Sequence, residues 1–413
     1  MLYRIAAVAL VVVLLSSCSE ENAFSGSTLP TTTTTSDSGG GGGGSEGGTA
    51  ADTTTGGGTT PTASSIVRKT QIPSAIPDGM GGTLTVSFES YDMGNSDASI
   101  SYILDDANGM QRVFRPDAGG PVELYSRPSP ELIFTTTSGN GNKILSHNGV
   151  RDVIDYTDGN MLAIGAALGA QKIDVISDAG DVVAFASNED LTGANPTGVN
   201  QLFTLSTDGA DTYNQITTFT INHMMEYVVL SGDGSRIFFS STSDLLEDGS
   251  NIGGMYQVFS VNTDGTGLTK LTDLNSSRVN ATHSSSDGSI ITLEIVNLDG
   301  NGIKWVQTLN TETGLLSEIV ATSGAGFSID YDLSGDGSKV TYLSAGTVAG
   351  VPIVYLLNSD GSSKTDVLSE RGSIRALRLN TDGSQISFQS NIEFDTPIGS
   401  DELSIQVYTL SLQ

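Results

Sequence analysis

A short turn that contains glycine recurs along the second half of the chain, and a β-prone strand follows it each time. The glycines are Gly180, Gly234, Gly288, Gly337 and Gly383, at intervals of 54, 54, 49 and 46 residues. The strands read VVAFAS from Val182, IFFSS from Ile237, IITL from Ile290, VTYL from Val340 and ISF from Ile386. Asp-Gly turns supply the positive φ of tight hairpins, and Val, Ile, Phe and Tyr favour pleated strands. Each unit therefore predicts antiparallel β structure that must bury its apolar face against a neighbouring unit.

Each unit also contains a second apolar strand. These strands read QLFTLS from Gln201, QVFSVN from Gln257, WVQTLN from Trp305, IVYLLN from Ile353 and IQVYTL from Ile405. After residue 65 no segment keeps a long 3.6-residue apolar period, and the best helical candidate, 161–170, is interrupted by two glycines. Short strands repeated at this interval predict an all-β fold, a single β-propeller of four-stranded blades.

The number of blades follows from the length of the repeating region. Two degenerate segments, 83–126 and 131–165, would raise the five clear repeats to seven. Seven blades over residues 65–413 would have about 50 residues each, close to the kelch-like period; six or eight blades also fit. The last repeat ends just after its third strand, so its outer strand must come from elsewhere. We expect 65–72 or 83–88 to supply that strand and to close the ring.

The turns share the pattern S-x-D-G-x-x-[IV]-x-[FY]. Its first five positions occur at 231–235, 285–289 and 334–338. In these motifs the chain resembles the blades of TolB-type propellers, from about residue 171 to the C-terminus. TolB proteins carry an α/β domain before the propeller, but no βα pattern precedes residue 80 here, and Trp305 alone cannot supply the Trp-Asp signature of WD repeats. The resemblance implies the fold and leaves the function open.

The first 18 residues have the pattern of a bacterial lipoprotein signal. Arg4 precedes eleven apolar residues, Ile5–Leu15, a run too short to span a bilayer as a helix. The following Ser-Ser-Cys18 completes a resemblance to the lipobox, whose Cys is acylated and becomes the first residue after cleavage. The resemblance implies a signal peptide at 1–17 and a lipid on Cys18. Because Ser19 and not Asp follows the Cys, it also implies the outer membrane of a Gram-negative cell, on the periplasmic side or at the cell surface.

Residues 18–64 are rich in Gly, Thr and Ser and include the runs 31–35 and 39–44. Such a composition cannot bury enough apolar surface to offset the entropy of ordering the chain. We therefore predict a disordered tether between the lipid and a propeller domain at 65–413.

The predicted domain carries no recognised catalytic motif. There is no P-loop, H-E-x-x-H or dinucleotide fingerprint, and the single G-x-S-x-G match, at 43–47, falls in the tether. His147, His223 and His283 share no metal-ligand spacing, and one Cys cannot build a zinc cluster. The formal charge of −29 disfavours nucleic acid as a partner, because phosphates are bound by Lys and Arg. We predict no catalytic residue, no metal and no other cofactor.

Calcium is the one cofactor for which the sequence offers weak candidates, Asn297, Asp299 and Asn301. The stretch 297–302 matches the first half of an EF-hand loop, but Thr308 stands at position twelve, where a bidentate Glu is needed. The stretch from Asn262 is similar. Because Asn, Asp and Gly also favour hairpin turns, we expect plain turns at both places.

These observations favour a non-enzymatic, lipid-anchored β-propeller of the bacterial cell envelope. Its expected role is to bind an envelope protein or a small ligand, as a monomer. The alternative is a propeller enzyme, a hydrolase or lyase with a diffuse site on one propeller face. A structural or surface-display module is a third reading, in which the acidic surface mainly provides solubility.

Overall fold

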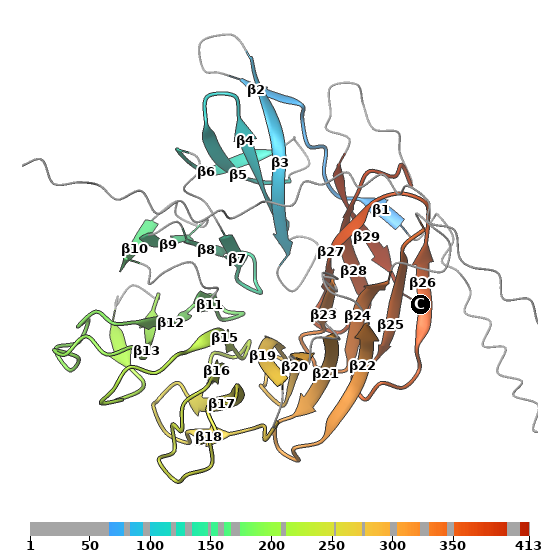
Figure 1. Ribbon diagram of the computed structural model, residues 1–413. Helices are drawn as coiled ribbons and strands as arrows, with labels where there is room; N and C mark the ends of the chain where they lie inside the picture. Colours follow the sequence, from blue (N-terminus) through green and yellow to red (C-terminus); the bar gives the residue numbers. More distant parts are fainter. Residues whose placement is uncertain are drawn as a thin grey trace, which may run out of the picture. The chain divides into compact units, whose positions relative to one another are not determined.

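The described part of the chain is built from β-strands joined by turns and loops, with no helix (Figure 1). The computed structural model describes residues 66–77, 83–93, 100–116, 121–128, 134–147, 150–155, 161–166, 174–207, 212–251, 253–274, 277–297, 304–322, 330–344, 351–394 and 405–412. They all belong to one compact unit, Gly56–Gln413. Within them no helix is long and apolar enough to cross a membrane.

The described strands form seven antiparallel sheets, the blades of a β-propeller. Blade 1 has five strands: β2 Ala75–Pro77, β3 Thr83–Met93, β4 Ile100–Asp106, β5 Met110–Arg115 and β6 Val122–Pro128. Blade 2 has β7 Phe134–Thr137, β8 Lys143–His147, β9 Val150–Asp155 and β10 Met161–Ala166. Blade 3 has β11 Asp174–Ile176, β12 Val182–Ser187, β13 Gln201–Ser206 and β14 Tyr213–Gln215.

The other four blades have four strands each. Blade 4 has β15 Glu226–Leu230, β16 Arg236–Ser241, β17 Gln257–Asn262 and β18 Thr269–Lys270. Blade 5 has β19 Ser277–Ser284, β20 Ile290–Asn297, β21 Lys304–Asn310 and β22 Leu316–Thr322. Blade 6 has β23 Tyr331–Leu333, β24 Lys339–Ser344, β25 Ile353–Asn358 and β26 Thr365–Ser369. Blade 7 has β27 Ile374–Leu379, β28 Gln385–Ser390 and β29 Gln406–Ser411, with β1 Ile66–Arg68 as its outer strand.

The first strands of the blades close a ring. The strands β3, β7, β11, β15, β19, β23 and β27 each contact the next one, and β27 contacts β3. Seven clusters of buried hydrophobic residues each join two neighbouring blades, including one that joins blade 7 to blade 1. The predicted seven-bladed propeller is therefore confirmed, and the two degenerate segments are blades 1 and 2.

The aromatic position of the repeat motif forms a cross-strand pair inside the blades. The ring centroids lie 5.1–5.9 Å apart in five blades, in the pairs Tyr102–Phe114, Phe185–Phe203, Phe239–Phe259, Tyr342–Tyr355 and Phe388–Tyr408. Each pair joins directly opposed residues of the second and third blade strands. Such pairs contribute about 0.5–1.5 kcal/mol each beyond their burial.

The Ser-x-Asp-Gly turns link one blade to the next. Within the blade 4 turn, Ser231 Oγ donates to Asp233 Oδ1 at 2.6 Å, and Gly234 has a φ of +73°. Between blades, backbone hydrogen bonds of 2.6–2.8 Å connect successive turns from blade 2 to blade 7: Asn140 N to Asp178 O, Asp178 N to Gly232 O, Asp233 N to Ser286 O, Ser286 N to Gly335 O, and Asp336 N to Thr381 O. The turns at this position, which carry the motif in blades 4, 5 and 6, therefore link the blades from 2 to 7.

The ring closes through the N-terminal part of the described chain. Strand β1 pairs with β29 in the register Ile66↔Leu410 and Val67↔Thr409. Just after β1, Thr70 Oγ1 donates to Gln406 Oε1 at 2.9 Å. Of the two segments expected to supply the missing strand, the first one does so, whereas the second lies in β3, the first strand of the blade 1 meander.

Candidate functional site

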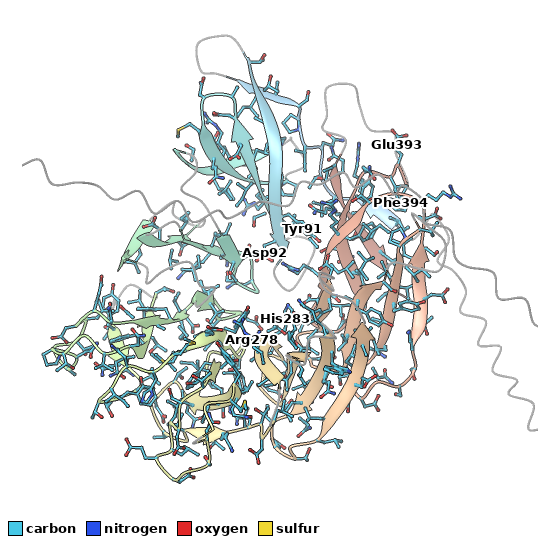
Figure 2. All side chains as sticks on the ribbon, in the orientation of Figure 1. Tyr91, Asp92, Arg278, His283, Glu393 and Phe394 are labelled. Atoms are coloured by element: carbon cyan, nitrogen blue, oxygen red, sulfur yellow. The ribbon has the colours of Figure 1, made fainter. Side chains whose placement is uncertain are left out.

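Ionisable side chains on the inner strands of blades 5, 6, 7 and 1 form a chain of interactions that we call the inner arc: His283, Asp332, Arg378 and Asp92. His283 Nε2 lies 3.4 Å from Asp332 Oδ1, and Arg378 Nε donates to Asp92 Oδ1 at 3.2 Å. The charge of Arg378 also acts on Asp332. Figure 2 shows Asp92 on β3 and His283 on β19. The inner arc thus crosses the seam between the last blade and the first.

The turn motif fixes the register of three of these residues. His283, Asp332 and Arg378 each stand two positions before the residue that opens the turn, which is Ser285, Ser334 and Asn380 respectively. Side chains two positions apart in a strand lie on the same face. In blades 3 and 4 the same position holds Val175 and Val229. This position therefore carries an ionisable side chain in three consecutive blades and an apolar one in two others.

A β-bulge in β27 brings backbone groups to two carboxylates of blade 6. The register of β27 on β28 shifts between Arg375 and Arg378, and Ala376 has a φ of +53°, which is strained for a residue with a side chain. The N–H of Ala376 donates to Asp330 Oδ2, and the N–H of Leu379 donates to Asp332 Oδ2 at 2.7 Å.

Blade 1 also holds this bulge. The hydroxyl of Tyr91 donates to the carbonyl of Ala376 and lies 3.3 Å from Ser387 Oγ. The next residue of β3, Asp92, contacts blade 2: its Oδ2 accepts a hydrogen bond of 2.7 Å from the N–H of Thr137. Hydrogen bonds from blades 6 and 1 thus support the backbone that carries Arg378.

Burial dominates the ionisation of this region. It raises the pKa of Asp332 to about 6, even though Arg378 opposes the shift by stabilising the carboxylate. Burial also raises the pKa of Asp330 above its ordinary value, again against the effect of Arg378. The carboxylates of Asp92 and Asp332 outweigh the effect of burial on Arg378, and its pKa rises.

Water reaches part of the inner arc. About a third of the Arg378 and His283 side chains is exposed (32% each), against 13% of Asp92 and 9% of Asp332. With Asp330, three carboxyl groups surround one guanidinium, so the region carries more acidic than basic groups. This arrangement can bind a positively charged group, and Asp332 can exchange a proton near neutral pH.

The residues singled out in the sequence fall in different places. Cys18, Asp299 and Asn301 lie outside the described residues, as do the side chains of Asn297 and His147. The second calcium-like stretch forms a plain turn, in which Thr266 N donates to Asp264 Oδ1 at 2.9 Å. Over the described ranges, no group of three or more His, Cys, Asp or Glu residues could hold a metal ion.

The two other histidines are partly buried. His223 packs edge-on against Phe219, with ring centroids 4.8 Å apart, and burial lowers its pKa. His283 belongs to the inner arc, and its Nδ1 lies 3.1 Å from Thr292 Oγ1.

Sequence reasoning missed Asp92, Asp330, Asp332 and Arg378. For Asp332 and Arg378 a signal was present, because they occupy one repeat position that is apolar in blades 3 and 4. A comparison of the repeats position by position would have marked them. Asp92 lacks that signal, because its blade was too degenerate to align.

The seven sheets, arranged in a closed ring, place this protein in the class of seven-bladed β-propellers. Known structures share that fold. Oligogalacturonate lyase from Vibrio parahaemolyticus aligns with a TM-score of 0.54 and 12% identity over 84% of this chain and 97% of that one. An oligogalacturonate lyase in complex with manganese aligns with a TM-score of 0.53 and 13% identity over the same shares. TolB from Acinetobacter baumannii aligns with a TM-score of 0.42 and 16% identity over 70% of this chain and 65% of that one.

No protein-family model matches the sequence, and no curated protein matches it either. At these identities the structural likeness shows the fold alone.

Proposed function

We propose that this chain is a non-enzymatic, lipid-anchored β-propeller of the bacterial cell envelope that binds a partner protein or a small ligand at the inner arc. The observation that carries the proposal is the excess of carboxyl groups around Arg378, in side chains that water partly reaches. Every charged member of the inner arc is held by protein groups from neighbouring blades, so the site is preorganised. Its charge favours a partner that presents a cationic group.

The lipobox resemblance supports the location. A lipid on Cys18 and a tether would keep the propeller close to the outer membrane and let it search the nearby envelope for its partner. The composition of 18–64 supports the same picture, because it favours a disordered segment.

Chemical cross-linking and capture from intact envelopes test the binding function. The double variant Asp92→Asn with Asp332→Asn removes two carboxyl charges while keeping one acceptor oxygen in each side chain. Glu123→Gln is the matched control. Glu123 is on β6, at the other edge of blade 1 from β2, and pairs with Arg112 on β5. We expect the parent and the control to capture the same partner and the double variant to lose it. Identical capture by all three proteins would contradict the proposal.

A propeller enzyme is the second candidate, and one observation favours it. A general acid or base works best with a pKa near the operating pH, and burial raises the pKa of Asp332 to about 6 beside His283. The test is an activity screen against peptides, glycans and lactones. Turnover that Asp332→Asn abolishes and Glu123→Gln preserves would replace the binding function with this one.

A further inference from the structure

Two loops at one face of the propeller, one between blades 3 and 4 and one within blade 4, carry exposed apolar side chains, which we call the methionine patch: Ile221, Met224 and Met255. Their side chains are 64%, 49% and 39% exposed, unusually high for large hydrophobic residues. Ile221 and Met224 lie between β14 and β15, and Met255 lies between β16 and β17. Both loops emerge on the propeller face opposite the Ser-x-Asp-Gly turns, because successive antiparallel strands alternate in direction.

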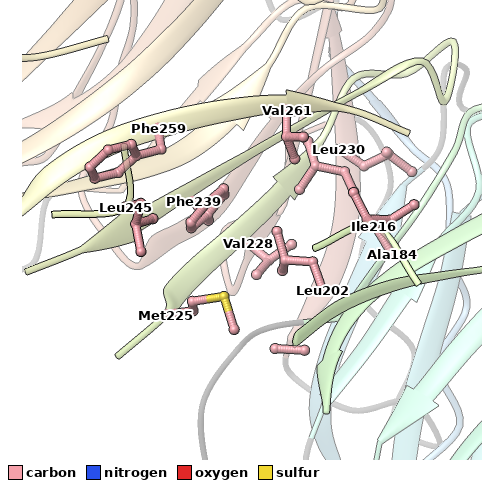
Figure 3. Close-up of a cluster of buried hydrophobic side chains, with 12 residues drawn as sticks. Ala184, Leu202, Ile216, Met225, Val228, Leu230, Phe239, Leu245, Phe259 and Val261 are labelled. Carbon is pink, nitrogen blue, oxygen red and sulfur yellow. The ribbon is translucent and has the colours of Figure 1, made fainter. Parts of the chain in front are cut away.

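Contacts between the loops show that the patch has a fixed base. The hydroxyl of Tyr256 donates to Met224 Sδ at 3.3 Å. Beneath the surface, Met225 from one loop and Leu245 from the other belong to one buried cluster with Phe239 and Phe259 (Figure 3). The exposed methionines therefore stand on a packed base, and flexible methionine side chains adapt readily to apolar partners.

Arg278 provides a polar anchor beside the patch. It forms an ion pair with Glu226, and its guanidinium carbon lies 5.6 Å and 5.1 Å from the ring centroids of Tyr227 and Tyr256. Its Nε is buried and has no hydrogen-bond acceptor among the described residues. The side chain as a whole is 37% exposed, so its guanidinium can still donate to a carbonyl oxygen of a bound partner.

A β-bulge builds this anchor. Neighbouring residues of a regular strand point to opposite faces, yet Glu226 and Tyr227 both contact Arg278. The register of β15 on β16 shifts between Glu226 and Val229, and Tyr227 has a φ of +53°. Strained backbone of this kind clusters at binding sites.

Negative charge beside the patch favours an apolar partner that also carries basic groups. Asp244, Glu247 and Asp248 lie in the loop between β16 and β17, and neither loop contains Lys or Arg. The nearby Lys270 pairs with Asp273 and donates to Ser250 O at 2.8 Å. The loop thus keeps an excess of negative charge, in keeping with the whole chain at −29.

From these observations we propose that the methionine patch binds an extended segment of a partner protein that carries apolar and basic side chains. Its apolar side chains cover the methionines, its basic groups face the loop carboxylates, and one of its backbone carbonyls accepts from the exposed part of the Arg278 guanidinium. This inference rests on the proposed binding function and adds contact residues other than those of the inner arc.

Fluorescence anisotropy with defined peptides tests the inference on the intact propeller. The probe is a labelled, capped octapeptide of alternating Leu and Lys, compared with versions in which Glu replaces Lys or Ser replaces Leu. We expect the Leu–Lys peptide to bind at least tenfold more tightly than either comparison peptide. Undetectable binding, or equal binding of the Leu–Glu peptide, overturns the proposal.

Variants locate the binding surface. Met224→Ser with Met255→Ser should weaken binding at least fivefold, and Arg278→Lys, which keeps the charge but loses the planar guanidinium, should weaken it as well. The matched control is Leu315→Ser with Leu316→Ser, because these leucines are also exposed but lie at the turn from β21 to β22, on the other propeller face. Equal weakening by the control pair overturns the proposal, as does a dimer of the parent that the methionine variant abolishes. Neither result affects capture through the inner arc, which the Asp92 and Asp332 variants test separately.

Discussion

Replacing Gly232 by Ala should destabilise the propeller through the contact between neighbouring turns. Gly232 lies in the blade 4 turn, and an added Cβ would stand 2.2 Å from Asp178 Oδ2 and 2.9 Å from Ser286 Cα. Asp178 comes from blade 3 and Ser286 from blade 5, and they are joined by a hydrogen bond of 2.7 Å. The backbone cannot shift easily, since Gly232 O accepts from Asp178 N at 2.7 Å.

The magnitude follows from two contributions. Overpacking a close contact costs about 1–3 kcal/mol. Loss of the hydrogen bond from Ser286 to the Asp178 carboxylate adds about 1.5–3 kcal/mol. We therefore expect the free energy of unfolding to fall by roughly 2.5–6 kcal/mol, a large part of a typical 5–15 kcal/mol.

Urea unfolding followed by circular dichroism measures this loss, and other glycines provide a graded control. At Gly335 the nearest atoms to an added Cβ, Thr381 Cα and Cγ2, are both at 3.1 Å, so Gly335→Ala should destabilise less. At Gly253 the nearest atom is 4.0 Å away, so Gly253→Ala should leave stability within about 0.5 kcal/mol. Asp178→Ala in the Gly232→Ala background should restore part of the loss. Equal midpoints for the Gly232 and Gly253 variants would refute the reasoning.

Three further predictions concern ionisation, the lipid and the C-terminal strand. The folded pKa of Asp332, about 6, lies above its ordinary 3.8, so its stabilising contribution is complete below the ordinary value and is lost as pH rises through 6. Lowering the pH from 7 to 4 should therefore stabilise the parent by on the order of 2 kcal/mol through Asp332, and the Asp332→Asn variant should lack this gain. Urea unfolding of both proteins measures the difference, and parallel pH profiles would contradict the prediction. Cys18→Ala should move the protein from the membrane fraction to the soluble envelope fraction, and pelleting with membranes after a high-salt wash would speak against the lipid. Deleting 400–413 removes β29 with the fully buried Val407, Tyr408 and Leu410, each contributing about 1.5–3 kcal/mol, and should unfold or aggregate the domain. Deleting 31–44, an equally long piece of the predicted tether, should leave the melting temperature unchanged. If the protein that lacks 400–413 melted like the parent, ring closure would be contradicted.

The repeated turns explain why the fold could be predicted. Each Asp-Gly turn fixes a hairpin locally, and the aromatic position after it fills the blade interior, as Phe239 does against Phe259. Because local chemistry and the global fold agree in every clear repeat, seven blades could be predicted with six or eight as alternatives, and the closing strand could be limited to two segments, 65–72 and 83–88. The fifth strand of blade 1, β2, had no such signal, since it pairs with β3 outside the repeat.

The inner arc could not be predicted because ring closure brings its members together. Asp92 and Arg378 are 286 positions apart in the sequence and share a hydrogen bond only because blade 7 returns to blade 1. The bulges at Ala376 and Tyr227 are equally hidden, since both are non-glycine residues in a left-handed conformation. Sequence patterns report regular strands, whereas these sites depend on local departures from them.

Ring closure is the claim on which the inner arc depends, and a designed disulfide tests it most directly. In a Cys18→Ala background, Val67→Cys and Thr409→Cys place thiols at directly opposed positions of β1 and β29. Opposed residues of adjacent strands are within disulfide reach, with Cα atoms about 4.5–5.5 Å apart. Ser387 opposes Thr409 on β28, so Val67→Cys with Ser387→Cys places the thiols two strand spacings apart, about 10 Å, which is too far. Peptide mass mapping after mild oxidation should find an intramolecular disulfide in the first pair and none in the second. A first pair that stays reduced, or that links only different molecules, would contradict the closed seven-bladed ring.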